Sequence, residues 1–242
     1  MNPSNSLASD AWSALSKNRA AWFSAIALTT MVLLVLLGPL VSPYEVDQTN
    51  WSKLAKPPSM QDGHIFGTDD LGRDLFVRTM YGGRISLMVG IVATLVSVLI
   101  GVSYGAISGF VGGKVDSIMM RIVDVLYAMP FLFFVILLMV FFGRSIFLIF
   151  IAIGAVNWLD IARIVRGQTL TIKGKEFVDA AKAGGVSTFR IIFRHIVPNL
   201  MGIVVVYVAL TVPQVILVES FLSFLGLGVQ EPMTSWGALV NQ

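Results

Sequence analysis

Long apolar runs without charge alternate with short charged segments along this chain of 242 residues. A helix needs roughly 20 apolar residues to cross about 30 Å of hydrocarbon, and five stretches reach or approach that length. They run over 20–44, 85–113, 125–143, 145–165 and 196–218. The pattern therefore predicts an all-α, polytopic bundle of five spans, in which Pro198 and Pro213 introduce tolerable kinks in the last span.

The composition supports a membrane location. Apolar residues make up 56% of the chain and charged residues 13%, about half the charged share of an average soluble domain, so most side chains must face an apolar solvent such as membrane lipid. The absence of cysteine excludes disulfides and thiolate metal sites, and no cofactor is predicted. The net charge of +3 fits basic cytoplasmic loops better than nucleic acid, which we do not expect as a partner.

The distribution of Lys and Arg predicts the orientation. With a cytoplasmic N-terminus, the inside segments carry eleven of the 17 basic residues, as the positive-inside rule favours. The chain then divides into a cytoplasmic segment 1–20, a first transmembrane helix 21–41, an outside loop 42–84 and a membrane domain 85–242. That domain contains a basic inside loop, 166–195. The first span is too long for a signal peptide and is interpreted as retained.

Glycine recurs every four residues near the end of the second predicted span, at Gly101, Gly105, Gly109 and Gly113. This spacing places the glycines on one helical stripe, where the missing side chains let a neighbouring helix approach closely. We expect Gly101, Gly105 and Gly109 to pack against another helix.

Residues 101–105 also match the G-x-S-x-G pattern of serine hydrolases. That motif works on a strained turn with a His and an acid nearby, whereas here it lies inside an apolar run. An intramembrane serine protease is the enzyme alternative. The sequence has no P-loop, so any ATP that drives this protein is hydrolysed by another chain, and we do not expect the chain to be an enzyme.

Three acidic residues lie near predicted span ends: Asp124, Asp160 and Glu219. Ionisable groups at membrane depth are functional candidates because their burial is costly, although Asp160 can form an i,i+3 pair with Arg163 instead. A proton-coupled secondary transporter is the second alternative. It would place such acids nearer the midplane and usually shows an internal repeat.

The inside loop contains a helix–turn–helix pattern. A short helix with a narrow face of small residues is predicted by four positions at i, i+3, i+4 and i+7: Phe177, Ala180, Ala181 and Gly184. The pair Gly184 and Gly185 ends that helix, and Ser187 can cap a second helix that runs toward Arg194. An amphipathic segment on anionic lipid would need a larger apolar face, so docking into a protein groove is favoured.

This loop resembles the EAA loop of the membrane subunits of bacterial ABC importers. Asp179-Ala180-Ala181, Gly185 and Pro198 fall in register with the family's acid-Ala-Ala, Gly and Pro positions. Asp179 replaces the usual Glu, and His195 and Val197 stand where Ile and Leu are commonest. Further segments resemble the peptide and nickel branch, and within it the C-type oligopeptide permeases: 66–74, 83–87, 112–117, 162–168, 223–228 and 229–232.

The resemblance implies a type I ABC-importer permease fold and ATP-driven import of oligopeptides across the bacterial inner membrane by alternating access. It implies as partners a homologous second permease subunit, two ABC ATPase subunits and a periplasmic or lipid-anchored peptide-binding protein. It assigns contact with the ATPases to seven residues of the inside loop: Glu176, Phe177, Asp179, Ala180, Ala181, Gly184 and Gly185. Members of the family normally have a sixth span, which we expect to be missing here at the C-terminal end.

Four charged residues form a cluster in the outside, periplasmic loop: Asp69, Asp70, Arg73 and Asp74. They can hold the loop together through local salt bridges and Asx turns. Alternatively, they can contact the binding protein or the charged ends of a peptide.

Overall fold

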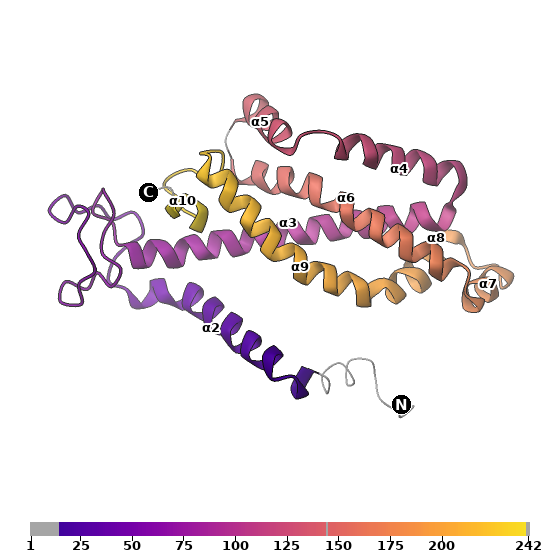
Figure 1. Cartoon of the computed structure of the whole chain (residues 1–242), viewed down its shortest axis with the longest axis horizontal. Helices are drawn as coiled ribbons and strands as arrows, with labels where there is room; N and C mark the ends of the chain where they lie inside the picture. Colours follow the sequence, from indigo (N-terminus) through magenta and orange to yellow (C-terminus); the bar gives the residue numbers. More distant parts are fainter. Residues whose placement is uncertain (1–14, 144, 241–242) are drawn as a thin grey trace. The chain divides into compact units, whose positions relative to one another are not determined.

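Helices account for the regular structure of the residues described in the computed structural model, 15–143 and 145–240, in which the β-structure is limited to two isolated bridges (Figure 1). This confirms the all-α prediction. The chain divides into two units, Met1–Arg84 and Ile85–Gln242, and each is described by itself.

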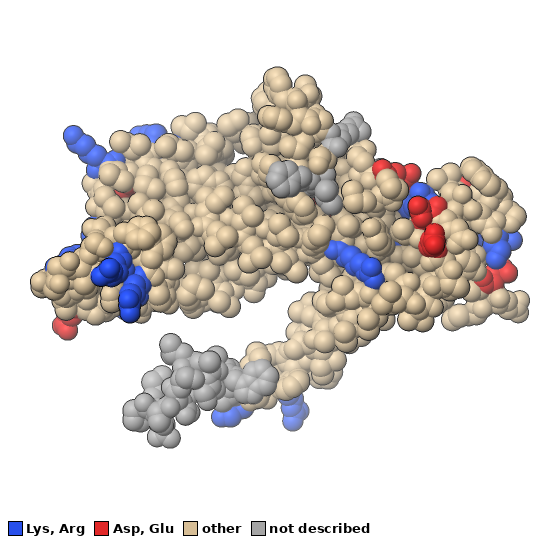
Figure 2. Space-filling model, turned by 180° about the vertical axis from the view of Figure 1, so that it is seen from behind, with Lys and Arg blue, Asp and Glu red and all other residues tan. Residues whose placement is uncertain are grey.

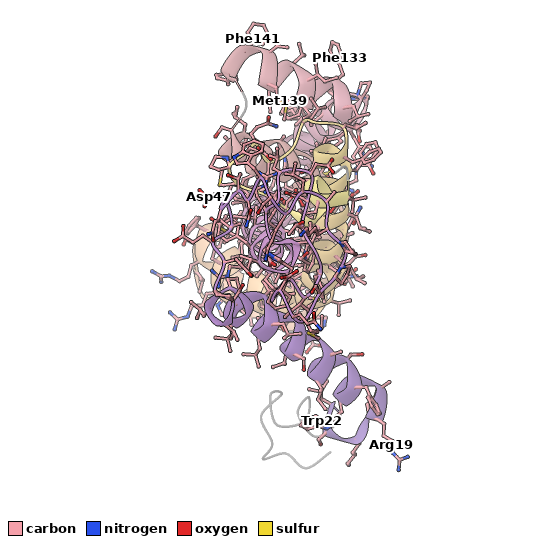
Figure 3. All side chains as sticks on the ribbon, turned by 90° about the vertical axis from the view of Figure 1, so that its left-hand side faces the viewer. Arg19, Trp22, Asp47, Phe133, Met139 and Phe141 are labelled. Atoms are coloured by element: carbon pink, nitrogen blue, oxygen red, sulfur yellow. The ribbon has the colours of Figure 1, made fainter. Side chains whose placement is uncertain are left out.

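The first unit begins with α2, Arg19–Val41. The side chain of Asn18 caps this helix, because its Oδ1 accepts hydrogen bonds from the backbone N–H groups of Ala20 and Ala21 at 3.0 and 3.3 Å. Arg19 and Trp22 lie in the first turn (Figure 3). Apolar side chains cover most of the surface of α2, as expected of a helix that faces lipid.

The last part of α2 contains Pro39, which has no N–H to offer to the carbonyl four residues earlier, that of Val35. Arg84 supplies the missing donor. Its Nε donates to the Val35 carbonyl at 3.0 Å, and its Nη2 donates to the carbonyl of Leu36. The guanidinium therefore replaces the helix hydrogen bond that the proline removes.

The helix α3, Leu75–Val111, begins in the first unit and continues into the second. It starts ten residues before the predicted boundary at residue 85, so the sequence pattern placed the start of this helix too late. The cause is the two arginines inside the first turns of the helix. Arg78 is fully buried and lies 3.4 Å from Asp69, and Arg84 is bonded to α2, so neither charge marks an exposed loop.

The third predicted span is broken. The predicted span, 125–143, contains only the last residues of α4, Gly113–Tyr127, together with all of α5, Phe131–Phe142, and the chain bends by 81° between the two helices. Pro130 separates them, because a proline lacks the N–H of a helix interior and disfavours helical geometry at the preceding residue. Three aromatic side chains of α5 are exposed, those of Phe142 and of Phe133 and Phe141 (Figure 3).

The remaining elements of the second unit are α6, Ile146–Lys173; α7, Glu176–Ala183; α8, Thr188–Ile191; the π-helix η1, Ile192–Ile196; α9, Val197–Phe224; and α10, Trp236–Val240. The elements from α8 to α9 form one helix of 37 residues, Thr188–Phe224. Its core-facing side packs on α6, and α10 packs against α9.

The main core of the second unit joins α3, α6, α7, η1 and α9. On the face that Figure 2 shows, Lys and Arg gather at the end of this unit that α7 and α8 form. Among the described residues, three helices are long and apolar enough to cross a membrane, and the bent α4–α5 pair adds a fourth if it forms one span. The count of five spans stays a prediction.

Candidate functional site

The loop that was predicted to lie inside folds into a helix–turn–helix, here called the elbow and defined as residues 176–191. The first helix, α7, ends in a Schellman motif: the Gly185 N–H donates to the Lys182 carbonyl at 3.0 Å, and the Val186 N–H donates to the Ala181 carbonyl at 3.1 Å. Gly185 has φ +72°, in the left-handed region that disfavours residues with a Cβ. The turn predicted at Gly184 and Gly185 is therefore present, and Gly185 is the residue that makes it possible.

A valine anchors α7 to the rest of the unit. Val178 is fully buried in the main core, and Ala181 and Val186 pack partly buried against the same core. The predicted narrow face is thus divided: Ala181 turns inward, whereas Phe177, Ala180 and Gly184 are exposed. Val178 was not among the predicted residues of this helix, although its i,i+3 spacing to Ala181 indicates a second apolar face.

The acidic residues of α7 remain at the surface. Glu176 and Asp179 are exposed, and Asp179 accepts a hydrogen bond from Lys182 at 3.0 Å. Carboxylates in the first turn favour the helix through its dipole. They also give the exposed face of α7 a negative edge beside Phe177.

The second helix of the elbow begins after Ser187, but the predicted side-chain cap is wrong. Ser187 occupies the N-cap position without a side-chain hydrogen bond to the helix. Its carbonyl accepts the N–H of Ile191 at 3.0 Å instead. Because α8 continues through η1 into α9, the elbow is covalently and helically continuous with the last predicted span.

A shallow hollow lies beside α8, and six residues line it: Ser187, Phe189, Arg190, Phe193, Arg194 and Pro198. The rings of Phe189 and Phe193 lie 4.6 Å apart. The surface next to α7 is therefore basic and aromatic.

An ion pair ties the helices behind the elbow together. Arg166 of α6 donates two hydrogen bonds of 2.6 Å to the carboxylate of Asp116 in α4, and Ser108 of α3 donates to the same carboxylate. This bidentate geometry fixes three helices at the end of the unit where the elbow lies.

The expected pair of Asp160 with Arg163 is not formed. Arg163 Nη2 lies 2.8 Å from Asp124 of α4, and the guanidinium lies 4.5 Å from the centre of the Tyr127 ring. The neighbouring helix α4 offers Arg163 both the carboxylate of Asp124 and the aromatic ring of Tyr127, whereas Asp160 offers a carboxylate alone. Asp160 is exposed.

The three glycines of α3 lie against α6. A Cβ at Gly101 would come within 2.8 Å of the Trp158 carbonyl, and one at Gly109 within 2.8 Å of the Arg166 carbonyl. At Gly105 it would overlap the Ala162 carbonyl. The two backbones are therefore in direct contact, and residues 101–105 lie in an uninterrupted helix rather than on the strained turn that a hydrolase nucleophile needs.

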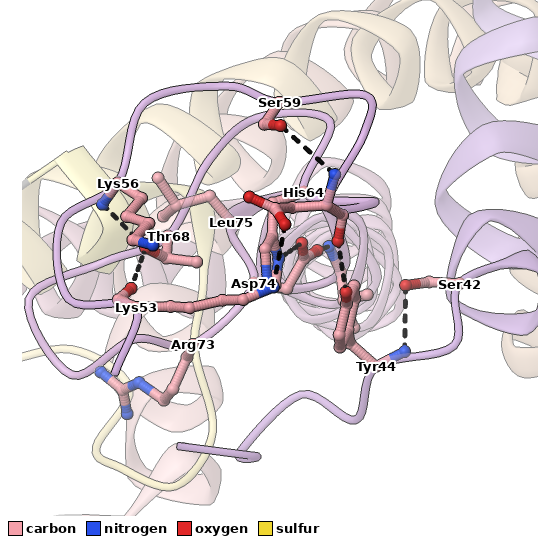
Figure 4. Close-up of polar contacts among 12 residues, drawn as sticks. Ser42, Tyr44, Lys53, Lys56, Ser59, His64, Thr68, Arg73, Asp74 and Leu75 are labelled. Carbon is pink, nitrogen blue, oxygen red and sulfur yellow. Dashed lines mark hydrogen bonds and ion pairs between the residues drawn. The ribbon is translucent and has the colours of Figure 1, made fainter. Parts of the chain in front are cut away.

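The buried acids of the charged cluster in the loop bind partners within that loop, as Asp74 does with His64 (Figure 4). Asp69 is buried, accepts the backbone N–H groups of Leu71 and Arg73, and lies 2.7 Å from Arg73 Nε. Burial alone raises the pKa of Asp69, but the hydrogen bonds from Arg73 and Leu71 outweigh it and hold that pKa below its usual value. Asp70, in contrast, is exposed.

Asp74 is the N-terminal cap of α3. One carboxylate oxygen accepts the Val77 N–H at 2.9 Å, and the other lies 2.8 Å from Nδ1 of the buried His64. The imidazole of His64 stacks on the ring of Tyr44 at 4.3 Å. This link of His64 to the cluster was not predicted, since the two residues are ten positions apart in an irregular loop.

Comparison with known proteins adds to this geometry. Residues 97–242 match the family model described as "Binding-protein-dependent transport system inner membrane component", and residues 6–58 match "N-terminal TM domain of oligopeptide transport permease C". The oligopeptide transport system permease protein OppC of Escherichia coli K12 is 59% identical over 236 residues, which cover 98% of this chain and 78% of that protein. The dipeptide transport system permease protein DppC of Bacillus subtilis is 49% identical over 99% of this chain and 74% of its own length.

Proposed function

This chain belongs to the family of binding-protein-dependent transport system inner membrane components, and on that premise we propose that it is a permease subunit of an ATP-driven importer of oligopeptides. Its curated relatives are described as oligopeptide and dipeptide permease proteins. The single structural observation that supports the proposal best is the elbow, an exposed small-residue helix joined to a long apolar helix.

The proposed setting is the bacterial inner membrane with a cytoplasmic N-terminus, as the distribution of basic residues favours. There the chain pairs with a homologous second permease subunit and with two ABC ATPases, which hydrolyse the ATP. A peptide-binding protein delivers the substrate from the outside. The apolar side chains exposed on α2 and α5 suit contact with membrane lipid.

The proposed coupling contact is the exposed face of α7. Phe177 supplies an aromatic side chain, whereas Ala180 and Gly184 let a groove wall of the ATPase approach the helix backbone. Val178 holds α7 on the core, so a force on α7 reaches the bundle. Since the helix from Thr188 to Phe224 extends over about 55 Å at 1.5 Å per residue, a rotation of the elbow displaces the far end of that helix and can drive alternating access.

Purification from the native membrane in mild detergent tests the proposal. We expect a second permease and two P-loop ATPases to co-purify with the chain. Phe177→Ala should reduce ATPase recovery and leave the second permease in place. The matched control is Phe189→Ala, which removes an exposed aromatic side chain from the second helix of the elbow. Recovery of the chain alone would contradict the proposal and favour a secondary transporter.

The turn of the elbow offers a sharper pair of variants. Gly185→Val should abolish uptake while the chain still inserts, because a left-handed residue with a Cβ costs about 1–2 kcal/mol. No atom lies within 4 Å of the Cβ position, so the effect is purely conformational. Gly185→Asn is the control, since asparagine tolerates this conformation. Equal uptake by both variants would show that the turn is not needed for coupling.

Asp70 is the proposed point of contact for the binding protein, because it is the exposed acid of the outside cluster. Asp70→Lys should reduce uptake and leave assembly intact. Asp62→Lys, at another exposed acid of the same loop, is the control. Unchanged uptake by D70K would remove this contact from the proposal.

A further inference from the structure

A buried carboxylate lies near the C-terminal end of α9. Glu219 is fully buried, and both of its oxygens have a hydroxyl donor. Ser86 Oγ of α3 donates to Oε2 at 3.0 Å, and Ser223 Oγ, one turn further along α9, donates to Oε1 at 2.7 Å. A carboxylate in this position is costly unless every lone pair that points inward is satisfied.

The hydroxyls that reach Glu219 are themselves held by the chain that follows α9. Ser86 Oγ accepts the backbone N–H of Trp236 at 3.2 Å. Ser223 Oγ accepts the N–H of Val229 at 3.3 Å and lies 3.3 Å from Ser235 Oγ. We call this group, Ser86, Glu219, Ser223 and Ser235, the latch.

The direction of these hydrogen bonds requires an acceptor at residue 219. Backbone N–H groups donate to the oxygens of Ser86 and Ser223, so the hydrogen of each hydroxyl is free to donate to the carboxylate. An ionised carboxylate only accepts. A glutamine has one acceptor and one donor, and its NH₂ group would leave one serine hydroxyl without an acceptor.

Two glycines allow the segment after α9 to lie this close. A Cβ at Gly228 would overlap the side chain of Ser223, and a Cβ at Gly237 would overlap the backbone of Ser220. The segment 225–240 therefore packs directly on α9 at the positions where the latch binds it. Hydrogen bonds and close packing, two independent observations, place the same segment on the same helix.

We infer that Glu219 is a positioning residue that locks residues 225–240 onto α3 at Ser86 and onto the end of α9, so that these three elements move as one body. In a transporter, the substrate opening at this end of the bundle would then lie between this body and another subunit, and residues 225–240 would stay bound to α9 throughout. This statement about movement rests on the proposed function, whereas the attachment of residues 225–240 through Glu219 does not.

The absence of cysteine from the sequence allows a direct test of the lock. Thr234 is buried in the segment and Glu231 is exposed in it. With Thr234→Cys in nanodiscs, which leave both membrane faces open, a membrane-impermeant maleimide should react at least about tenfold more slowly than with Glu231→Cys, because local opening must precede labelling.

Adding Glu219→Ala should bring the T234C rate close to that of E231C. Adding Glu219→Gln should give an intermediate rate. Gln214→Ala, an exposed polar position on the same helix, is the matched control and should leave T234C protected. Protection of T234C in the E219A background, or E219Q protection equal to that of the parent, would overturn the inference.

A second cysteine distinguishes release of the segment from general unfolding. Ala162 is buried in α6, and Ala162→Cys should stay protected when E219A is present. Labelling of both A162C and T234C in that background would show that Glu219 supports the whole fold, and the specific role would be rejected.

The movement is tested in the assembled transporter. T234C should remain protected both without nucleotide and with ATP and vanadate, while E231C is labelled in both states. Increased labelling of T234C with nucleotide would show that the segment lifts and would refute movement as one body. If no ATPase assembles with the chain, the proposed function fails, whereas the E219A result still decides the lock.

Discussion

Asp69 and Glu219 are both buried carboxylates, but their charges are compensated in different ways. Asp69, in the loop of the first unit, lies 2.7 Å from Arg73 Nε and 3.4 Å from Arg78 Nε. Glu219, in α9 of the second unit, accepts from the hydroxyls of Ser86 and Ser223, and the described residues form no ion pair with it.

The difference reflects what each surrounding can supply. In a loop next to water, arginine guanidinium groups can approach a buried carboxylate at little cost. In an apolar helix bundle, pairing the carboxylate with an arginine would require the burial of a second charge. Hydroxyls provide donors without that cost, but each contributes less than a charged donor. Loss of a partner should therefore be more damaging in the loop than in the latch.

The largest effect is expected for Asp69→Asn. It removes the charge between two buried arginines, and breaking a buried ion pair typically costs about 3–5 kcal/mol. We expect the thermal midpoint of the detergent-solubilised chain to fall and the loop 42–74 to become sensitive to protease. Asp70→Asn, at the neighbouring exposed acid, should change neither measurement. Similar effects of the two variants would mean that burial of Asp69 is unimportant.

Acidic pH should reproduce part of the stability loss of D69N in the parent chain, because it protonates Asp69. The pKa of Asp69 is lower in the folded loop than the usual pKa of an aspartate, so its contribution to stability is complete above that usual pKa and disappears as the pH falls through the lowered pKa. The protease sensitivities of the loop in the parent and in D69N should therefore differ fully at pH 7 and approach each other only below the usual aspartate pKa. Parallel curves would exclude Asp69 as the titrating group.

Ser86→Ala should have a smaller effect. It leaves one oxygen of Glu219 without its donor and the Trp236 N–H without its acceptor, and each unsatisfied buried group costs about 1–3 kcal/mol. The expected result is partial labelling of T234C, below that caused by E219A. Ser103→Ala, another serine of α3, is the control. A labelling rate above that of E219A would show that Ser86 has a role beyond the latch.

The smallest effect is expected for Asp124→Asn. The pair of Asp124 with Arg163 is largely exposed, and exposed ion pairs typically contribute about 0–1 kcal/mol. The thermal midpoint should stay close to that of the parent, and added salt should have little further effect. A loss comparable to that of D69N would show that exposure is a poor guide to the strength of these pairs.

The apolar runs predicted where most helices lie, because membrane helices need long stretches without charge. The predicted helix boundaries were wrong where charged residues lie inside a helix. Arg78 and Arg84 delayed the predicted start of α3, since a sequence does not reveal that each has a buried or carbonyl partner. The break at Pro130 was within the reach of sequence reasoning, because proline rarely continues a helix.

The candidate sites were predictable to different degrees. The elbow turn depends on two adjacent glycines and local spacing, which the sequence displays directly. The links from His64 to Asp74 and from Ser86 to Glu219 join residues that are distant in the chain or lie in irregular loop, and they emerge only from the fold. Glu219 could be singled out as a costly acid, but its partners could not be named.

The hydrogen bond from Arg84 to the Val35 carbonyl joins residues 49 positions apart. Because a membrane chain is synthesised from its N-terminus, the Val35 carbonyl has no hydrogen bond from Arg84 until the intervening loop has been synthesised. An unsatisfied backbone group in hydrocarbon costs several kcal/mol. The first span therefore reaches its full stability only after the beginning of α3 has emerged, and biogenesis of the two helices is coupled through one proline and one arginine.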